Sequence, residues 1–158
     1  MRETLPYRPN VSIIAFKEDQ FLVVNRVQDK PDTWKFPQGG IDNGEDAISA
    51  GLREFSEELG TSNLEIVGLS KHENRYEWPD EQIHKHNQKY DKQWRGQKQR
   101  FVIARYVGSD EDFKPDPDEI SSYAWVSREQ VLTSNKKREH LFEQYDGLIQ
   151  DIFYEFEL

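Results

Sequence analysis

The 158-residue chain has no cysteine, no long run of hydrophobic residues and no excess of positive charge. The absence of cysteine excludes a disulfide framework, a catalytic thiolate and a zinc site with cysteine ligands, so a bound metal would need hard oxygen ligands. No apolar stretch is long enough for a transmembrane helix, and the N-terminal residues resemble neither a signal peptide nor a transit peptide. We therefore expect a cytoplasmic protein without a membrane partner.

The charge balance is acidic, with a formal net charge of −9. Tight, sequence-independent binding of nucleic acid depends on Lys and Arg contacts with phosphates, so this balance argues against a DNA partner. The basic residues are nevertheless concentrated, because residues 84–100 hold six Lys and Arg against a single Asp, interleaved with Tyr90 and Trp94. This basic segment is either a solvated surface loop or a surface that contacts a polyanionic substrate. We favour phosphate contact for part of it.

The length and a hydrophobic content of 35% suit one domain, residues 1–158, with one core. β-Branched and aromatic runs predict a hairpin of two strands at residues 11–16 and 21–24 around a polar turn at residues 17–20. The same signals predict further strands at residues 34–37, 64–71, 99–107 and 123–126. Residues 79–98 show no periodicity, and we expect a long, functional loop there.

Apolar residues at helical spacing between Leu141 and Phe156 predict a C-terminal amphipathic helix that continues through Gly147 and packs on the core. Strands, a helix, more strands and then helices, in that order, predict an α+β fold. We expect a central mixed sheet with helices on both faces.

A further helix is predicted between Gly44 and Gly60. Apolar residues recur in this segment at the spacing of one buried face; they are Ile48, Leu52, Phe55 and Leu59. Gly60 falls where a glycine ends a helix, and Glu45 and Asp46 would lie in the first turn, where the helix dipole favours carboxylates.

Three glutamates lie on the other side of this predicted helix. Glu54, Glu57 and Glu58 are spaced i, i+3 and i+4, so their carboxylates share one face that points away from the core. Like charges at this spacing repel by roughly a few tenths of a kcal/mol per pair, and a divalent cation would offset that repulsion. Charge patterning alone favours a solvated ion-pair surface, so the metal-site interpretation depends on the wider sequence.

The wider sequence contains a longer pattern across residues 39–61. Its fixed positions are Gly39, Glu45, Arg53, Glu54, Glu57, Glu58 and Gly60. This pattern resembles the Nudix box, with every defining Gly, Glu and Arg present. Thr61 departs from it, since the family usually has a large aliphatic residue there, and the departure affects packing behind the loop more than metal chemistry.

Residues 7–11, 34–42 and 95–101 resemble the Nudix branch that contains bacterial RNA 5′-pyrophosphohydrolases and diadenosine tetraphosphate hydrolases. The resemblance covers about residues 7–127 and implies a three-layer α/β/α sandwich with a central mixed sheet. It also implies a site for Mg²⁺ or Mn²⁺ formed by Gly39, Glu54, Glu57 and Glu58. Gly39 would bend the backbone so that a carbonyl or a substrate oxygen approaches the ion closely.

Other site residues follow from the same resemblance. Arg53 would orient the Glu57 carboxylate, with Glu45 in a similar supporting part. Glu119 falls where the branch has an additional glutamate, which makes it a fourth metal ligand or the general base; otherwise it is a loop carboxylate. The candidates for substrate contact are Tyr76, which would stack on a base, and Arg8, Arg26, Lys35, Gln97 and Lys98. Each has an alternative interpretation as an ordinary surface residue, or as a core residue for Tyr76.

The implied activity is hydrolysis of a phosphoanhydride, with Glu58 or Glu119 accepting the proton of the attacking water. Two substrates suit the motifs: the 5′-triphosphate end of RNA, with release of pyrophosphate, and dinucleoside polyphosphates such as diadenosine tetraphosphate. The acidic composition stands against RNA, but the basic segment would grip its first nucleotides, and we favour RNA ends. A non-catalytic nucleotide sensor is a remote alternative, because every box glutamate is present.

Overall fold

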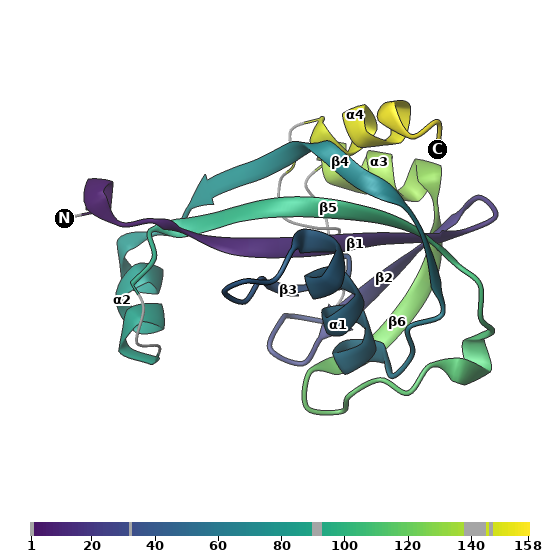
Figure 1. Ribbon diagram of the computed structural model, residues 1–158, viewed down its shortest axis with the longest axis horizontal. Coiled ribbons are helices and arrows are strands. Elements are labelled where there is room, and N and C mark those ends of the chain that lie inside the picture. The colour runs from purple at the N-terminus through teal and green to yellow at the C-terminus, as the bar shows by residue number, and fades with distance from the viewer. Residues whose placement is uncertain (1, 32, 90–92, 138–144, 146) are drawn as a thin grey trace.

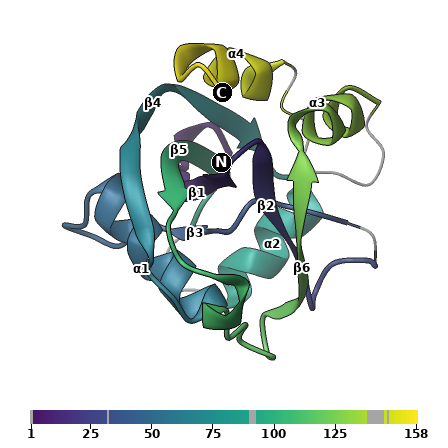
Figure 2. The same cartoon turned by 90° about the vertical axis from the view of Figure 1, so that its right-hand side faces the viewer.

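A computed structural model describes residues 2–31, 33–89, 93–137, 145 and 147–158. In this part of the chain, six strands form one sheet in the order β4-β5-β1-β2-β6, with β3 paired to β1 outside that path. The strands are β1 (Tyr7–Lys17), β2 (Gln20–Arg26), β3 (Gln38–Gly40), β4 (Leu64–Glu77), β5 (Gly96–Tyr106) and β6 (Ile120–Ser127). The helices are α1 (Ala47–Leu59), α2 (Asp80–Lys89), α3 (Arg128–Lys137) and α4 (Leu148–Glu155), with short 3-10 helices at Arg2–Thr4 and Asp110–Asp112. Figures 1 and 2 show α1 on one side of the sheet and α3 and α4 on the other.

The core lies on both faces of β1. Ile14 packs with Ile149 and Phe153 of α4, whereas its neighbour Ile13 packs with Phe55 of α1. Successive residues of a strand point to opposite faces, so an uninterrupted apolar run suits a strand that is covered on both sides. The predicted α+β fold, with a mixed sheet between helices, is confirmed.

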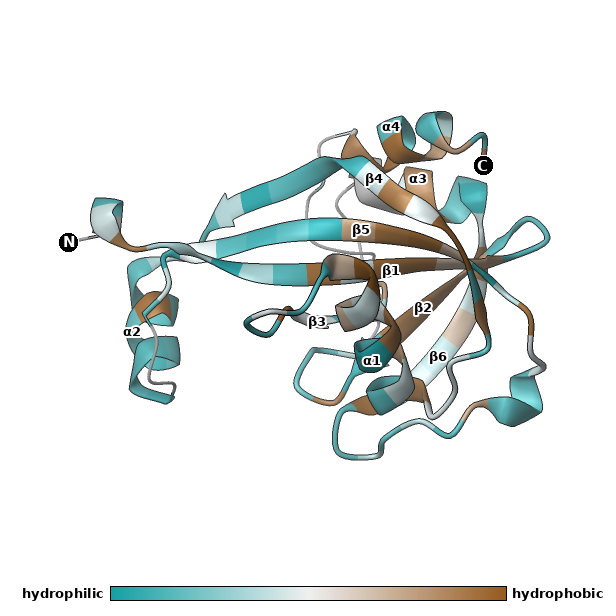
Figure 3. Ribbon diagram, viewed as in Figure 1, coloured by the Kyte–Doolittle hydropathy of each residue, from teal (hydrophilic) through white to brown (hydrophobic). Residues whose placement is uncertain are grey.

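Strand β1 changes partner along one of its edges. Asn10 lies opposite Gly40 of β3, whereas Phe16 lies opposite Phe21 of β2. On its other edge, β1 pairs in parallel with β5. Figure 3 shows that the ends of β1 and β5 nearest α2 are hydrophilic, whereas their other ends are apolar. The sheet therefore has one half that forms the core and one half that presents polar side chains.

Most predicted strands are present. The hairpin of β1 and β2 is confirmed, and β4 and β6 extend beyond the predicted bounds, β4 as far as Glu77. β5 begins earlier than predicted, at Gly96, and ends at Tyr106. The prediction of a strand at residues 34–37 is wrong, because only an isolated bridge between Val24 and Lys35 forms there and β3 begins at Gln38. Proline has no N–H to donate to a ladder, and Pro37 contributes only its carbonyl, which accepts from the Ile13 N–H at 2.8 Å.

The prediction of a loop at residues 79–98 is also wrong, because α2 occupies half of it. α2 has no buried residue and therefore no apolar stripe that a sequence pattern could reveal. Its ends suit the helix dipole, with Asp80 and Glu81 in the first turn and His86 and Lys89 in the last. Tyr90 and Lys92 of the basic segment lie outside the described residues.

The C-terminal helix is shorter than predicted. α4 begins at Leu148, and Gly147 does not continue a helix but caps it, with φ of 84°. Ile149, Ile152 and Phe153 are buried, which confirms the core role of this segment, while Leu141 lies outside the described residues. In the described part of the chain, no helix combines the length and apolar character needed to cross a membrane.

Candidate functional site

A cleft of about 940 Å³ opens along the polar ends of β1 and β5. Its walls come from these strands, from the end of β2 and the loop after it, from β3, α1, α2 and the end of β4, and from residues 118–119. Polar and charged side chains from segments far apart in the sequence therefore meet in one place.

The four carboxylates that the sequence singled out are among those that line this cleft: Glu54, Glu57, Glu58 and Glu119. Their exposure differs, because the Glu57 side chain is 57% exposed, that of Glu54 is 15% exposed, and Glu58 as a whole is 4% exposed. All three helix glutamates therefore reach the cleft, but the sequence analysis did not predict that Glu58 is buried. The segment before β6 covers this side of α1, and the Asp116 N–H donates to the Glu58 carbonyl at 2.9 Å.

Glu58 is a buried carboxyl with incomplete partners. Burial raises its pKa to about 9, and the charges of Glu54 and Glu119 act in the same direction, against Arg26 and the backbone N–H of Gln38. Its Oε2 atom is buried without a hydrogen-bond partner among the described residues. Such an oxygen costs free energy unless a proton or a cation satisfies it.

Gly39 of β3 allows a second carboxylate to approach the backbone. A Cβ atom at Gly39 would lie 2.0 Å from Cδ of Glu54 and within 2.4 Å of both of its oxygens. Only glycine leaves this space open. Burial raises the pKa of Glu54, while the hydrogen bond from Arg53 opposes the shift. The close approach seen at Gly39 is that of the Glu54 carboxylate, whereas the predicted approach of a carbonyl or substrate oxygen to a metal ion there stays a prediction.

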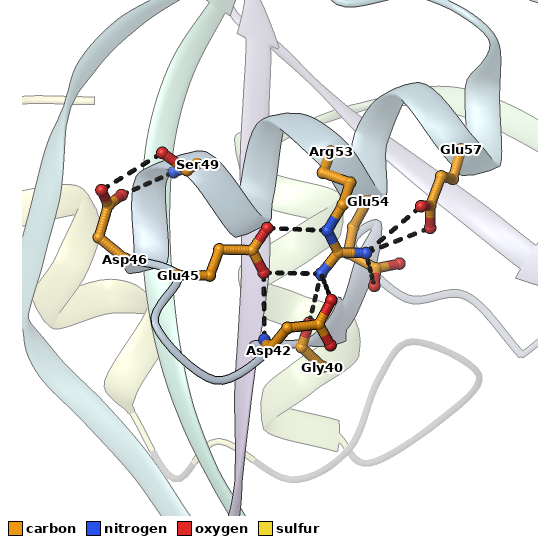
Figure 4. A network of polar contacts seen from close by, with 8 residues as sticks. All are labelled: Gly40, Asp42, Glu45, Asp46, Ser49, Arg53, Glu54 and Glu57. Carbon is orange, nitrogen blue, oxygen red and sulfur yellow. Dashed lines mark hydrogen bonds and ion pairs between the residues drawn. The ribbon is translucent and has the colours of Figure 1, made fainter.

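Arg53 fixes the carboxylates from the other side (Figure 4). Its guanidinium donates to the two oxygens of Glu45 at 2.9 and 2.8 Å, to Glu54 at 2.8 Å and to the Gly40 carbonyl at 2.9 Å. Its contacts with Glu57 are longer, at 3.3 and 3.4 Å. The predicted contact with Glu57 is present, but Arg53 mainly ties α1 to the loop that follows β3.

The start of α1 differs from the prediction. Asp46 is the N-cap, with its side chain accepting from the Ser49 N–H at 2.8 Å, so Glu45 precedes the helix instead of lying in its first turn. The hydrogen bonds from Arg53 and from the Asp42 N–H lower the pKa of Glu45 to about 2. Glu45 therefore remains charged as the partner of Arg53. The other end agrees with the prediction, because Gly60 ends α1 with φ of 74°.

Five of the six predicted substrate-contact residues line the cleft: Arg8, Arg26, Lys35, Tyr76 and Gln97. Lys98 does not, because side chains alternate along a strand and its neighbour Gln97 takes the cleft side. The Lys98 ammonium lies 3.5 Å from Glu73 instead. The prediction of a substrate contact for Lys98 is therefore contradicted by the geometry.

The remaining candidates are held by other side chains. Arg8 donates to Oε1 of Gln97 at 3.0 Å, and Gln97 in turn donates to the Tyr76 hydroxyl. Elsewhere in the lining of the cleft, Arg26 lies 2.9 Å and Lys35 3.7 Å from the Asp29 carboxylate. Asp29 is a cleft residue that the sequence analysis did not single out. It holds the two cations close to one another.

A chain of side-chain amides, three of them buried, is a second feature that the sequence analysis missed. Nε2 of Gln99 donates to Asn10 at 3.1 Å and to Gln38 at 3.0 Å, and Asn74 donates to Oε1 of Gln99 at 3.1 Å. These bonds connect β4, β5, β1 and β3. Only Gln99 lies inside a predicted strand, and its partners depend on strand pairing, which the sequence does not reveal.

Comparison with protein families matches residues 6–146 to the NUDIX domain. The chain belongs to the Nudix family. Among its relatives, the RNA pyrophosphohydrolase of Gluconobacter oxydans (strain 621H) is 40% identical over 136 residues, which are 84% of this chain and 78% of that protein. The RNA pyrophosphohydrolase of Rickettsia bellii (strain OSU 85-389) is 33% identical over 154 residues, which are 92% of this chain and 94% of that protein.

Solved Nudix structures share the fold. An Ap4A hydrolase from C. elegans, in a binary complex, matches with a TM-score of 0.59 and 19% identity. The match covers 80% of this chain and 84% of the hydrolase chain. A NUDIX hydrolase from Nitrosomonas europaea matches with a TM-score of 0.65 and 21% identity. This match covers 95% of this chain and 90% of the Nitrosomonas chain. At these identities the likeness extends to the architecture alone.

Nudix hydrolases generally use divalent metal ions, and the residues of this chain fit such an ion. The donors are carboxylate oxygens, which hard cations prefer, and they include the unpartnered oxygen of Glu58 and the Glu54 carboxylate that lies against Gly39. Among the described residues, no three His, Asp or Glu side chains are arranged so that they could already hold a metal ion together.

Proposed function

We propose that this Nudix protein hydrolyses the 5′-triphosphate end of RNA and releases pyrophosphate. Relatives named RNA pyrophosphohydrolase, at 40% and 33% identity, support this substrate. The observation that carries the proposal is the lining of the cleft, which brings Glu54, Glu57, Glu58 and Glu119 together with the cations of Arg8, Arg26 and Lys35. Phosphoanhydride hydrolysis needs both groups, because substrate oxygens and their counter-ions must be held together.

Glu54, Glu57, Glu58 and Glu119, with the backbone at Gly39, would hold Mg²⁺ or Mn²⁺. When bound, such ions neutralise the charge that develops on the phosphoryl group and make water more acidic. Their binding would also satisfy the buried oxygen of Glu58.

The side chains of the cleft perform the remaining steps. Arg8, Arg26 and Lys35 bind non-bridging phosphate oxygens, and the Tyr76 ring offers a face to a base. Glu58 or Glu119 accepts a proton from water while the water oxygen bonds to phosphorus. The bond from that phosphorus to the bridging oxygen breaks, and the products are pyrophosphate and a 5′-monophosphorylated RNA.

The test is steady-state kinetics with 5′-triphosphorylated RNA and with diadenosine tetraphosphate, in Mg²⁺ and in Mn²⁺. We expect a higher kcat/KM for RNA, and a loss of roughly two orders of magnitude or more in kcat for Glu57→Gln. Glu57 is exposed, so its variant should keep the fold. The matched control is Glu65→Gln, which removes the same single negative charge at an exposed site outside the cleft.

Asymmetric hydrolysis of dinucleoside polyphosphates is a second candidate. The cleft offers two aromatic surfaces, Tyr76 and the pair of Trp78 and His86, whose ring centroids are 4.5 Å apart, and a dinucleotide has two bases to place. A higher kcat/KM for diadenosine tetraphosphate would favour this candidate over RNA ends. Nucleotide binding without turnover of either substrate would favour the sensor alternative.

A further inference from the structure

Helix α2 gives the cleft a basic wall that the proposed chemistry leaves without a role. The α2 residues that line the cleft are Gln82, Lys85, His86 and Lys89. Their spacing of i, i+3, i+4 and i+7 is that of one helical face. No α2 residue is buried, so apolar packing does not account for the orientation of this face. The face that α2 turns to the cleft is polar along its whole length.

Contacts within the cleft indicate that Arg8 lies between the glutamates and α2. The Arg8 guanidinium approaches β3 so closely that a Cβ atom at Gly40 would lie 2.7 Å from it, and it also holds Gln97. Burial and then the charge of Arg8 lower the pKa of His86, which lies against Trp78. Figure 1 likewise shows α2 at the end of β1 and β5 away from α1. The order along the cleft is carboxylates, Arg8 and then α2.

The cleft has room for more than a triphosphate. Its volume of about 940 Å³ is at the upper end of the range of roughly 300–1,000 Å³ for small-molecule sites. A triphosphate held between the glutamates and Arg8 leaves the α2 wall for whatever follows the first nucleoside. In RNA that is a phosphodiester chain, which carries one negative charge per nucleotide. Lys85 is exposed and forms no ion pair with any residue in the described part of the chain.

We propose that α2 binds the phosphodiester backbone of the nucleotides that follow the 5′ end, with Lys85 and Lys89 as the contacting residues. This inference rests on the proposed function and specifies how the site recognises an RNA chain. Lysine contacts phosphate as a point charge and reads no base, so the recognition is independent of sequence. A local basic wall of this kind lets a protein with net charge −9 hold RNA at one place only.

The test compares a 5′-triphosphorylated hexanucleotide with ATP, which lacks the downstream chain. In the double variant Lys85→Gln/Lys89→Gln, kcat/KM for the hexanucleotide should fall about tenfold, mainly through KM, while that for ATP changes by less than about twofold. The slope of log kcat/KM against log salt for the hexanucleotide should become shallower by about 1.4, or about 0.7 for each lost contact. Glutamine is a good helix former, so α2 should persist.

The matched control is Lys17→Gln/Lys71→Gln, which removes the same charge from two exposed residues outside the cleft. This control should leave the ratio of the two kcat/KM values unchanged. An unchanged ratio in the α2 variant, with wild-type protein active on RNA, would overturn the inference. So would an equal loss on both substrates, because α2 would then contact the triphosphate itself.

A binding measurement separates this inference from the proposed function. If the wild-type protein hydrolyses neither substrate, the proposed function fails, and fluorescence anisotropy with a 5′-monophosphorylated hexanucleotide still tests α2. We expect the variant Lys85→Gln/Lys89→Gln to bind this probe about tenfold more weakly than wild-type protein. Equal affinities would overturn the role of α2.

Discussion

The substitution Glu58→Gln should stabilise the metal-free protein as it removes activity. Glu58 is buried at 4% exposure, and its pKa is raised to about 9 from an ordinary value of 4.5. A raised carboxyl pKa means that the folded protein keeps a proton that the unfolded chain releases. The stability linked to this group is therefore fully present below pH 4.5 and is lost as the pH rises toward 9.

The magnitude follows from the difference between the two pKa values. Each pH unit above the ordinary pKa costs about 1.4 kcal/mol, so at pH 7 the folded protein has lost about 3 kcal/mol of stability through Glu58. Glutamine has nearly the same shape and no proton to release. The difference in unfolding free energy between Glu58→Gln and wild type should therefore shift in favour of the variant by up to about 3 kcal/mol between pH 4 and pH 7.

The assay is urea unfolding at several pH values in the presence of a chelator, followed by tryptophan fluorescence. Replacing the carboxyl with an amide also changes the unfolding free energy by an amount that does not depend on pH. Comparing the difference between variant and wild type at several pH values removes this constant contribution. A second series with Mn²⁺ should stabilise wild-type protein more than the variant, because an ion that binds only the folded state adds stability. A free-energy difference that stays constant from pH 4 to pH 7 would refute the assigned environment of Glu58.

Three further predictions concern the surroundings of the carboxylates. Gly39→Ala places a methyl group where the Glu54 carboxylate lies, so kcat/KM should fall by roughly 100-fold with an unchanged circular dichroism spectrum; full activity would contradict this. Arg53→Lys loses the bidentate hydrogen bond to the Glu45 carboxylate, and steady-state kinetics should show that kcat/KM falls by about 10- to 100-fold. Because the pKa of Glu45 is lowered to about 2, its stabilisation is present above pH 4.5 and lost as the pH falls toward 2. The Tm difference between wild type and Glu45→Gln should shrink over that acid range, and a difference independent of pH would contradict it.

The parts of the site that the sequence predicted correctly are those set by local spacing. The existence of α1 and the grouping of its glutamates follow from helical periodicity and the box pattern, and Gly60 ends the helix as expected. The burial of Glu58 could not be predicted in this way. It depends on a segment that returns to α1 from nearly sixty residues later in the chain, at Asp116.

The mistakes at α2 and Lys98 have different causes. α2 lacks an apolar stripe, and periodicity is the main signal by which a helix is recognised in a sequence, so a fully polar helix resembles a loop. Gln97 and Lys98 both lie in the predicted loop, just before the predicted strand at residues 99–107, whereas in the structure they belong to β5. Which of them faces the cleft depends on the register of that strand. A shift of one residue would exchange their places.

The contact between the end of α1 and the chain before β6 limits how this protein can vary in length. The last carbonyls of a helix have no partner within the helix, and here Leu59 and Glu58 accept from the N–H groups of Lys114 and Asp116 at 2.7 and 2.9 Å. Glu119 follows three residues later. An insertion or deletion at residues 114–119 would therefore shift Glu119 relative to Glu58, whereas a loop elsewhere on the surface could change length without that effect. We expect related sequences to tolerate length changes in other surface loops far more often than within residues 114–119.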